Sequence, residues 1–309
     1  MTSEVRRAAQ ILRAGGLVAF PTETVYGLGA DASSRKAVAR LYAVKRRPAD
    51  HPVIVHFASA DDAFDWASEV PDAARTLAKQ FWPGPLTLIL KRSFKAKDFV
   101  TGGQPSVGLR VPSHPVARQL LKEFGGAVAA PSANRFGQVS PTTAAHVRED
   151  LGQDVDLVLE GGPSEVGIES TIVDLSSGSA VLLRPGAITR QEIDAIVRVT
   201  GEQSAVRHSG GLERHYAPRT PARMVPAHAL DQEISKGKSV AVLAFSRPDE
   251  RVDFWLRMPR EPRAYAQKLY AALRELDSAD CERILVEAPP DAPEWDAVRD
   301  RLKRACEQG

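Results

Sequence analysis

Short apolar runs alternate with amphipathic stretches over the first 200 residues of the chain. Runs such as VIVHF at 53–57 have the length and flanking residues of buried strands. Strands are expected at residues 17–20, 53–57, 86–90, 107–111, 127–130, 155–159, 171–175 and 181–183. Helical spacing predicts a helix that Ser3 caps and Gly15-Gly16 ends, and further helices at 34–44, 59–68, 72–81, 114–124, 142–151 and 189–199. This alternation indicates an α/β or α+β sheet protein.

The pattern breaks between residues 201 and 222 and then resumes. Ser209-Gly210-Gly211 has the composition of a linker, but the cluster Arg214-His215-Tyr216 is more than a spacer needs, so this segment is expected to pack over something. Strands at 239–245 and 283–287 and helices at 263–276 and 294–306 follow. We therefore expect a first domain at 1–200, a linker at 201–222 and a small parallel α/β domain at 223–309.

Composition and charge narrow the class of protein. A chain of 309 residues that is 43% hydrophobic and 26% charged is neither disordered, collagen-like nor a disulfide-stapled miniprotein. The net charge of +2 is too small for a general nucleic-acid or membrane binder, so any cationic site must be local. Cys281 and Cys306 lack the spacing of a metal or redox motif. With no apolar run long enough for a signal peptide or a membrane span, a cytoplasmic location without a membrane partner is expected.

Several common catalytic motifs are missing from the sequence. It has no GxxxxGK[ST] phosphate loop, no GxGxxG after a strand, no HExxH and no GxSxG. Conventional NTPases, dehydrogenases, zinc hydrolases and α/β-hydrolases are therefore disfavoured.

Polar clusters instead follow the predicted strands, where open α/β sheets place ligands. PTETVYGLG at 21–29 suits a small polar ligand, and it equally fits a hairpin-like turn with capping threonines. Lys45-Arg46-Arg47 would gain from an anion between the cations, although basic residues at a helix C-terminus also complement its dipole. Arg110 interrupts an apolar strand and, if it points inward, needs an anionic partner, either a structural glutamate or a substrate carboxylate.

Two further clusters lie later in the chain. Ser132, Asn134 and Ser140 offer hydrogen bonds suited to phosphate or ribose, while Ser140 could also be only a helix cap before Pro141. GIEST at 167–171 and LRPG at 183–186 are polar insertions at the edges of apolar strands.

The ordered series PTETVYGLG, KRRP, VIVHF, SVGLRVP, APSAN, SPT, GIESTIVD and LRPG resembles the L-threonylcarbamoyladenylate synthase family, whose core is called YrdC-like. The resemblance covers nearly all of residues 5–200, and the linker with the following α/β unit is similar to the long, two-domain type. It implies a twisted mixed open sheet with flanking helices and a small C-terminal Rossmann-like parallel α/β domain. It also implies a nucleotidyltransferase that makes threonylcarbamoyl-AMP and pyrophosphate from L-threonine, bicarbonate and ATP for tRNA threonylcarbamoyladenosine modification.

Carried over position by position, the resemblance implies site residues. Lys45 and Arg47 match its KxR pair and Ser132 and Asn134 its SxN pair, both tied to activity. The implied threonine pocket consists of Thr24, His56, Arg110, Ala130 and Ser170. The implied nucleotide contacts are Arg47, His51, Ser106, Ser132, Ser140, Arg184 and Tyr216, with His51 standing where relatives tend to carry Asn.

The implied chemistry needs alignment and charge neutralisation rather than a protein nucleophile. Lys45, Arg47 and Arg184 are assigned to the phosphates and Arg110 to the threonine carboxylate, while hydroxyls such as that of Thr24 would reject valine. Mg²⁺ is expected to be held by the phosphates of ATP and its own waters, without a dedicated metal site or an organic cofactor.

Because water would destroy the labile product, the segment 201–221 is hypothesised to cover the pocket as a lid. Tyr216 would then lie against the nucleotide, with Gly210 and Gly211 as hinges.

Two rival functions remain open at this stage. An RNA-binding module would use the cations at 91–97 with those at 45–47, although a solvated loop explains the former. A carbamoyl-adenylate-forming enzyme would share the YrdC-like core, but such proteins bring cysteine clusters that this sequence lacks. The expected partner is a downstream tRNA threonylcarbamoyl transferase, with a weak RNA contact as a further possibility.

Overall fold

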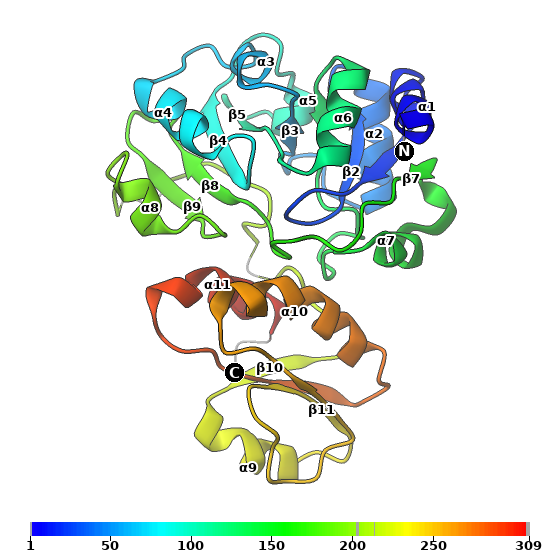
Figure 1. The fold of residues 1–309 in the computed structure, drawn as a ribbon, viewed down its shortest axis with the longest axis vertical. Coiled ribbons are helices and arrows are strands. Elements are labelled where there is room, and N and C mark those ends of the chain that lie inside the picture. The colour runs from blue at the N-terminus through cyan, green and yellow to red at the C-terminus, as the bar shows by residue number, and fades with distance from the viewer. Residues whose placement is uncertain (1, 202–203, 213, 307–309) are drawn as a thin grey trace.

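The computed structural model describes residues 2–201, 204–212 and 214–306, which form two stacked units (Figure 1). The described part of the first unit contains a nine-stranded sheet in the order β7-β1-β2-β6-β3-β5-β4-β8-β9. Its strands are β1 (Val18–Phe20), β2 (Gly27–Asp31), β3 (Ile54–His56), β4 (Leu86–Lys91), β5 (Ser106–Arg110), β6 (Val128–Ala129), β7 (Leu157–Val158), β8 (Thr171–Asp174) and β9 (Val181–Arg184). The sheet is mixed, since β1–β7, β3–β5 and β4–β8 are parallel pairs and the other neighbours are antiparallel. The expected mixed α/β fold is confirmed.

Helices flank this sheet, and all of them except the unexpected helix at Asp98–Thr101 overlap the predicted ranges. They are α1 (Thr2–Arg13), α2 (Arg35–Lys45), α3 (Ala60–Phe64), α4 (Asp72–Phe81), α5 (Asp98–Thr101), α6 (Pro115–Phe124), α7 (Ala144–Leu151) and α8 (Arg190–Asp194), with a 3₁₀ turn η1 at Gly152–Asp154. Ser34 caps α2 by accepting a hydrogen bond from the Ala37 N–H, as a serine before an apolar-periodic stretch favours.

The predicted cap Ser3 is wrong, and of the two alternatives for Ser140 the helix cap is excluded. Helix α1 begins at Thr2, one residue before the expected cap Ser3. Helix α7 is capped by Thr143, whose hydroxyl accepts the His146 N–H, so Ser140 is not its cap. Ser140 is free to bond elsewhere because the chain does not enter the helix until Ala144.

Strand β2 was not among the expected strands. Its sequence GLGAD has two glycines and no β-branched residue, so its propensity for a strand is low. It forms because β1 and β6 pair with it from both sides. The stretch 21–26 therefore connects two antiparallel strands, which agrees with the hairpin-like alternative for PTETVYGLG.

The second unit is built on four described strands, all parallel, in the order β10-β13-β11-β12. Its elements are β10 (Ala222–Val225), η2 (Ala227–Ala229), α9 (Leu230–Ser235), β11 (Val240–Ala244), β12 (Phe254–Arg257), α10 (Pro262–Asp277), β13 (Arg283–Glu287), η3 (Pro293–Trp295) and α11 (Asp296–Ala305). The parallel α/β prediction is confirmed, although β10, α9 and β12 were not expected. Helices α10 and α11 lie between the small sheet and the first unit, and α9 lies at the far side (Figure 1).

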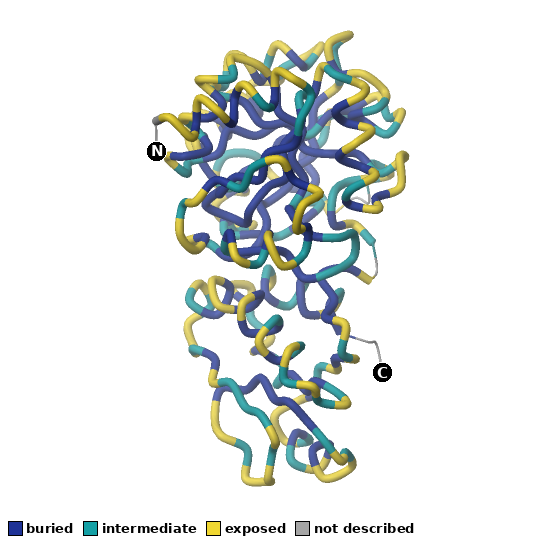
Figure 2. The backbone as a smooth tube through the Cα atoms, turned by 90° about the vertical axis from the view of Figure 1, so that its right-hand side faces the viewer, coloured by how far each residue is buried: buried dark blue, intermediate teal, exposed yellow. Residues whose placement is uncertain are grey.

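The two units share an apolar contact. Val25, Val139 and Ile168 of the first unit belong to one buried cluster with Tyr270 of α10 and Leu302 of α11. In Figure 2 the buried backbone is continuous through the centre of the first unit and reaches the junction with the second. The junction is thus packed like a core rather than hinged by a bare linker.

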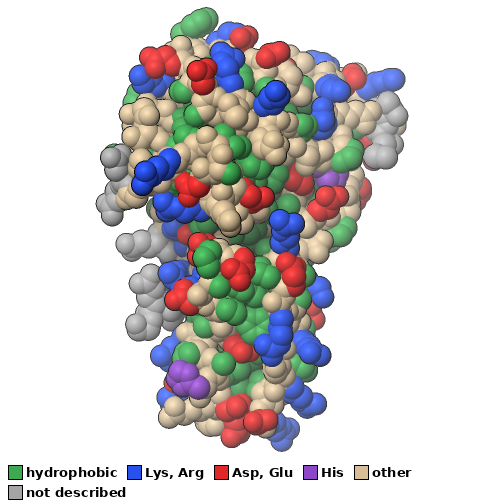
Figure 3. Space-filling model, turned by 60° about the vertical axis from the view of Figure 1, so that its left-hand side comes forward, with side chains coloured by type: hydrophobic (Ala, Val, Ile, Leu, Met, Phe, Trp, Pro, Cys, Tyr) green, Lys and Arg blue, Asp and Glu red, His purple; other side chains and the backbone are tan. Residues whose placement is uncertain are grey.

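No helix among the described residues is both long and apolar enough to cross a membrane. On the face in Figure 3, positive and negative side chains are interspersed over both units. The cations at 91–97 include Lys91 and Lys95, which pair with Glu69 and Asp65. This pairing favours the solvated-loop interpretation of the run.

Candidate active site

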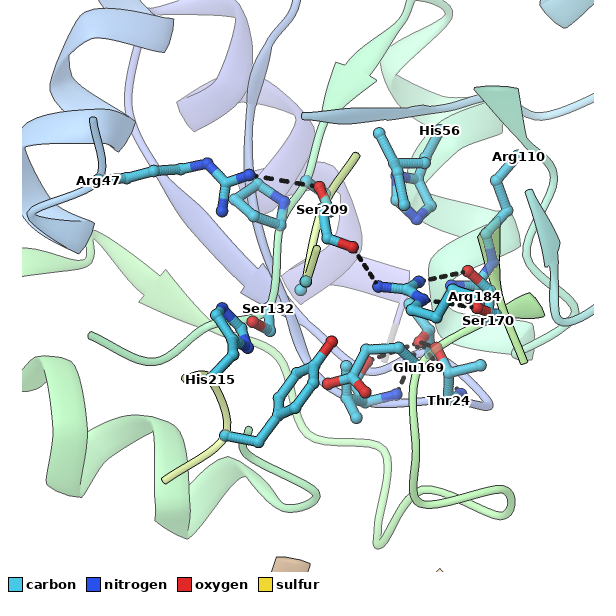
Figure 4. A pocket seen from close by; sticks show the side chains of 18 residues that line it. Thr24, Arg47, His56, Arg110, Ser132, Glu169, Ser170, Arg184, Ser209 and His215 are labelled. Atoms are coloured by element: carbon cyan, nitrogen blue, oxygen red, sulfur yellow. Dashed lines mark hydrogen bonds between the residues drawn. The ribbon is translucent and has the colours of Figure 1, made fainter. Parts of the chain in front are cut away.

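A small cavity in the first unit collects residues from most of the polar clusters (Figure 4). Its lining includes these residues predicted from the sequence: Thr24, Arg47, His56, Arg110, Ala130, Ser132, Ser170, Arg184 and Tyr216. They come from the β1–β2 connection, the end of α2, strands β3, β5 and β9, the loops after β6 and before β8, and the segment joining the two units. Residues spread over most of the first unit therefore converge on one place.

Arg184 and Arg47 are the two buried cations of the lining that the segment between the units touches. Arg184 donates from Nε to Ser170 O at 2.9 Å and from Nη1 to Ser209 O at 2.8 Å. Arg47 donates from Nη2 to Pro52 O at 2.7 Å and to Ser209 Oγ at 3.4 Å. Burial lowers the pKa of both guanidinium groups. Two poorly hydrated cations facing one cavity form a site that an anion would stabilise.

Lys45 lies behind the cavity rather than in its lining. It is 1% exposed, and its Nζ donates to Ser132 O at 2.5 Å and to Asn134 O at 2.6 Å. Burial and the nearby Arg47 hold its pKa well below the usual range. In this conformation Lys45 shapes the loop that presents Ser132. The three cations Lys45-Arg46-Arg47 therefore do not act together. Arg46 is the C-cap of α2, in a left-handed conformation, and it separates Lys45 from Arg47.

Arg110 has the buried partner that the sequence requires. Its Nη2 lies 2.7 Å from Glu23 Oε1, and the other oxygen of Glu23 accepts the Ser113 N–H at 3.1 Å. Of the two partners considered for Arg110, a structural glutamate or a substrate carboxylate, the structure contains the first, Glu23. Arg110 Nε remains buried without a partner among the described residues, which leaves one donor for a ligand.

Glu169 is a buried carboxylate of the lining. Its Oε1 accepts the Ser140 hydroxyl at 2.6 Å, and its Oε2 accepts the Tyr270 hydroxyl and Arg301 Nε, each at 2.8 Å. Burial opposes its ionisation, but Arg301 and Arg184 outweigh that effect and lower the pKa of Glu169 to about 2. The group is therefore an anion whose two oxygens are already bonded.

The segment between the units contributes to the lining of the cavity, and its action as a lid stays a prediction. We call its described residues, 204–212 and 214–221, the connecting segment. Ser209, Gly210, His215 and Tyr216 of this segment line the cavity, and Tyr216 is 1% exposed. The His215 N–H donates to Arg304 O at 3.0 Å, so the second unit holds the segment from behind.

Several buried polar atoms at the cavity have no hydrogen-bond partner among the described residues. They are His56 Nδ1, Arg110 Nε, His215 Nδ1 and the Tyr216 hydroxyl. Burial lowers the pKa of His56 and of His215 to about 3, so both imidazoles are neutral at pH 7. Because an unpaired buried polar group costs free energy, this cluster points to a ligand that satisfies it.

The cavity has a volume of about 50 Å³. Sites for small molecules typically enclose roughly 300–1,000 Å³, so neither a nucleotide nor an amino acid of threonine's size enters this closed form unchanged. The connecting segment forms one wall, so its displacement is the most direct way to admit a ligand.

The remaining predicted residues lie near the cavity but outside its lining. Asn134 is buried and donates from Nδ2 to Gln138 O at 2.7 Å, and Ser140 bonds Glu169. Ser106 lines a neighbouring small cavity that shares Ile54 and Ser209 with the first. His51 is half-buried, with its ring centroid 5.4 Å from that of Phe136.

Sequence reasoning missed some residues of the lining. Thr22, Glu169, Ser209 and His215 lie in motifs that the sequence analysis quotes, but none received a role. Membership of these motifs was the only sequence signal for the four residues. Their contacts involve residues far along the chain, which the motifs do not identify. Among the described residues, no three His, Cys, Asp or Glu side chains are grouped as metal ligands.

Comparisons with known proteins match this chain along almost its whole length. A family model described as Telomere recombination matches residues 10–186, and one described as Threonylcarbamoyl-AMP synthase, C-terminal domain, matches residues 188–306. The Threonylcarbamoyl-AMP synthase of Pyrococcus abyssi is 38% identical over 98% of this chain and 94% of its own. That of Bacillus subtilis is 38% identical over 98% of this chain and 93% of its own.

Solved structures show the same arrangement. Sua5 of P. abyssi complexed with L-threonine is 37% identical and superposes with a TM-score of 0.92, covering 99% of this chain and 94% of that chain. A variant of the same protein with a histidine and a tyrosine replaced by alanine gives a TM-score of 0.91 at 36% identity, covering 99% and 93%.

Proposed function

The chain belongs to the threonylcarbamoyl-AMP synthase family, and from that membership we propose how its residues divide the work between the substrates. The enzyme forms threonylcarbamoyl-AMP and pyrophosphate from L-threonine, bicarbonate and ATP, as the motif resemblance implied. The observation that carries the assignment of roles is the convergence of Thr24, Arg47, Arg110 and Arg184 on one covered cavity.

The reaction requires the threonine amine and bicarbonate to combine into a carbamate with the loss of one water molecule. A carbamate oxygen then attacks the α-phosphorus of ATP and pyrophosphate leaves. No step needs a protein nucleophile, so the site contributes alignment, charge neutralisation and exclusion of water.

Threonine is proposed to lie on the side of the cavity formed by β3 and β5. The unpaired Nε of Arg110 is available to its carboxylate, and Nη2 stays with Glu23. Thr24 and Ser170 supply hydroxyl groups for the threonine side chain, while His56 and Ala130 complete the wall. Valine has no hydroxyl group to bond to Thr24 or Ser170, which is the basis for its rejection.

ATP is proposed to bind beneath the connecting segment. Arg47 and Arg184 would give up their bonds to Ser209 and neutralise the phosphates, with Ser132 and the covering Tyr216 against the nucleotide. Lys45 would reach a phosphate only by exchanging its bonds to the Ser132 and Asn134 carbonyls. The proposed contacts of His51, Ser106 and Ser140 require a more open cavity, since none of them lines the closed one.

Mg²⁺ is proposed to enter with ATP. The carboxylate of Glu169 lines the described cavity, but both of its oxygens are bonded to side chains of the protein. Phosphate oxygens and water would therefore hold the ion, where it would neutralise the charge that develops on the leaving pyrophosphate.

The product is proposed to pass to a tRNA threonylcarbamoyl transferase in the cytoplasm. Its reactive acyl-phosphate anhydride hydrolyses in water, so a rapid transfer is expected. Weak direct contact with RNA stays a secondary proposal. The ion pairs of Lys91 and Lys95 lower its electrostatic benefit.

Pyrophosphate release tests the function directly. Release is expected with L-threonine, bicarbonate and ATP together, less with serine and least with valine. Omission of bicarbonate should abolish it. Equal rates with all three amino acids would overturn the assigned substrate, and salt-sensitive RNA binding without pyrophosphate release would favour the RNA-binding alternative.

A further inference from the structure

Arg301 is a completely buried guanidinium on α11, far along the chain from the cavity residues. Its side chain has an exposure of 0%. Nε donates to Glu169 Oε2 at 2.8 Å, Nη2 to Glu169 O at 3.2 Å and Nη1 to Pro185 O at 3.0 Å. Nη1 also pairs with Asp300 at 2.7 Å. A fully buried cation is retained only when nearly every donor is used, and here the partners lie in both units.

Each partner of Arg301 in the first unit is the chain neighbour of a cavity residue. Glu169 precedes Ser170, and Pro185 follows Arg184. Arg184 bonds Ser170 through both Nε and Nη2, at 2.9 Å to the carbonyl and 3.0 Å to the hydroxyl. Arg301 therefore contacts the two backbone stretches that carry Arg184, the cation assigned to the phosphates, and Ser170, the hydroxyl assigned to threonine.

Arg301 also contacts the connecting segment. Its Cζ lies 5.4 Å from the ring centroid of Tyr216, in the arrangement of a cation–π contact. The Tyr216 ring also packs against Tyr270, with a centroid separation of 5.7 Å. Tyr270 in turn donates to the same oxygen of Glu169 that Arg301 binds. Tyr216 thus contacts two side chains of the second unit, Arg301 and Tyr270.

The next turn of α11 holds the same segment by its backbone. Arg304 Nη1 donates to Leu212 O at 2.5 Å, and Arg304 O accepts the His215 N–H at 3.0 Å. Asp300 accepts from Arg304 as well as from Arg301. One face of α11 therefore contacts the cavity loops and the segment that covers them.

We propose that Arg301 is a positioning residue of the synthase reaction, which sets Arg184, Ser170 and Tyr216 in register when the connecting segment closes over ATP. The proposal rests on the proposed function of the cavity and adds a role for the second unit, namely to supply the rigid face against which the cavity closes. Arg301 is not itself a lining residue of the cavity; it contacts the lining through Glu169 and Tyr216 and, by this proposal, touches neither substrate.

The consequence is a specific kinetic signature. Without Arg301, Tyr216 and the Glu169 loop lose their common anchor, so the connecting segment, after opening to admit ATP, closes again over the bound nucleotide in fewer molecules. The apparent affinity for ATP is the intrinsic affinity multiplied by the fraction of molecules that close, so it falls as that fraction falls. The KM for ATP should therefore change more than the kcat measured at saturating ATP.

The experiment uses the full chain with Arg301→Met, Arg301→Lys and the control Lys303→Met. Lys303 lies on the exposed side of the same turn, so its substitution removes the same charge without touching either anchor. Arg301→Met should raise the KM for ATP at least about tenfold, and Arg301→Lys should restore part of this because a cation remains over the Tyr216 ring. Lys303→Met should stay close to the wild-type KM.

A second readout does not depend on turnover. ATP with L-threonine should protect the connecting segment of the wild-type chain from trypsin cleavage after Arg207 and Arg219, and should fail to protect it in Arg301→Met. Folded Arg301→Met with the KM and the protection of Lys303→Met would overturn the proposal. If the wild-type chain releases no pyrophosphate, the proposed function fails, while the protection assay still tests the role of Arg301.

Arg301→Met leaves Glu169 buried without its cation, so folding of that variant is checked by thermal unfolding. If it does not fold, Tyr270→Phe and Arg304→Met decide the question. The first removes one hydrogen bond to Glu169 without changing charge, and the second removes the bond to Leu212. Each should raise the KM for ATP several-fold, and an unchanged KM in both would overturn the proposal.

Discussion

Gly210 lies where the connecting segment passes closest to the hydroxyl of Tyr216. Its φ is +79°, and a Cβ built on it would lie 2.0 Å from the Tyr216 oxygen and 3.2 Å from Arg184 Nη1. Tyr216 itself has a φ of 61°, in the left-handed region that costs a non-glycine residue about 1–2 kcal/mol. The closed segment therefore needs glycine at position 210. It also needs the contacts with the second unit to hold Tyr216 in its left-handed conformation.

Gly210→Ala should impair closure more than folding. We expect the KM for ATP to rise about tenfold because the methyl group displaces the Tyr216 ring, while the free energy of unfolding falls by only about 1–2 kcal/mol. Gly201→Ala is the matched control, since nothing lies within 4 Å of its Cβ position. Pyrophosphate kinetics and urea unfolding of both variants check this, and equal KM values would contradict it.

Single residues show how far sequence reasoning reaches. The argument that Arg110 must have an anionic partner was correct, and Glu23 is that partner. The sequence could not choose between Glu23 and a substrate because the choice depends on a contact 87 residues apart. For the same reason it could not separate Lys45, which bonds carbonyl groups, from Arg47, which lines the cavity.

At the scale of elements, the sequence predicted where most strands lie, but it did not predict which strands pair in the sheet. Runs of β-branched residues such as 171–175 gave β8, whereas β2 has no such run and is a strand only because of its neighbours. The placement of polar clusters after strands foretold the convergence seen at the cavity, since several strands end there. The division of the chain at residues 200 and 222 stays a prediction.

Helix α8 offers a test of local stability that is separate from activity. Thr189 accepts the Glu192 N–H at 3.3 Å, and Glu192 Oε2 accepts the Thr189 N–H at 2.7 Å, which forms a capping box. Thr189→Ala should lower the free energy of unfolding by about 1 kcal/mol and leave kcat and KM unchanged, because α8 contributes nothing to the described lining.

Urea unfolding of Thr189→Ala, Glu192→Ala and the double variant tests the box. The loss in the double variant should be smaller than the sum of the single losses, because each substitution already breaks the reciprocal pair. Strict additivity would mean that the two bonds act independently.

At the scale of the whole molecule, the site depends on both units. The pair of Glu169 and Arg301 joins residues 132 positions apart, and no periodicity or motif marks Arg301 within α11. A sequence pattern identifies the helix and its buried face, but the partner of a buried arginine is settled only by the packing of the two units. This is the part of the site that could not be predicted from the sequence.

Buried and half-buried histidines, two of which line the cavity, make the folded chain sensitive to acid. Burial lowers the pKa of His56 and His215 to about 3 and that of His146 and His208 to about 4. The unfolded chain therefore takes up protons first as the pH falls below the ordinary value of about 6.5, and stability decreases from there down to the folded pKa. The pKa of Glu169, at about 2, places its own loss of stability at lower pH, in the window below the ordinary glutamate value of 4.5.

We expect the free energy of unfolding to fall between pH 7 and pH 5 by roughly 1–2 kcal/mol for each fully buried histidine. His215→Gln should remove about one such share of the loss, because glutamine has no proton to gain in this range. His228→Gln changes an exposed side chain and serves as the control. Urea unfolding at pH 7, 6 and 5 measures the slopes. A His215→Gln variant whose stability falls with pH as steeply as that of the control would show that His215 is already accessible to protons in the folded chain, and hence that the connecting segment is not closed over the cavity in solution.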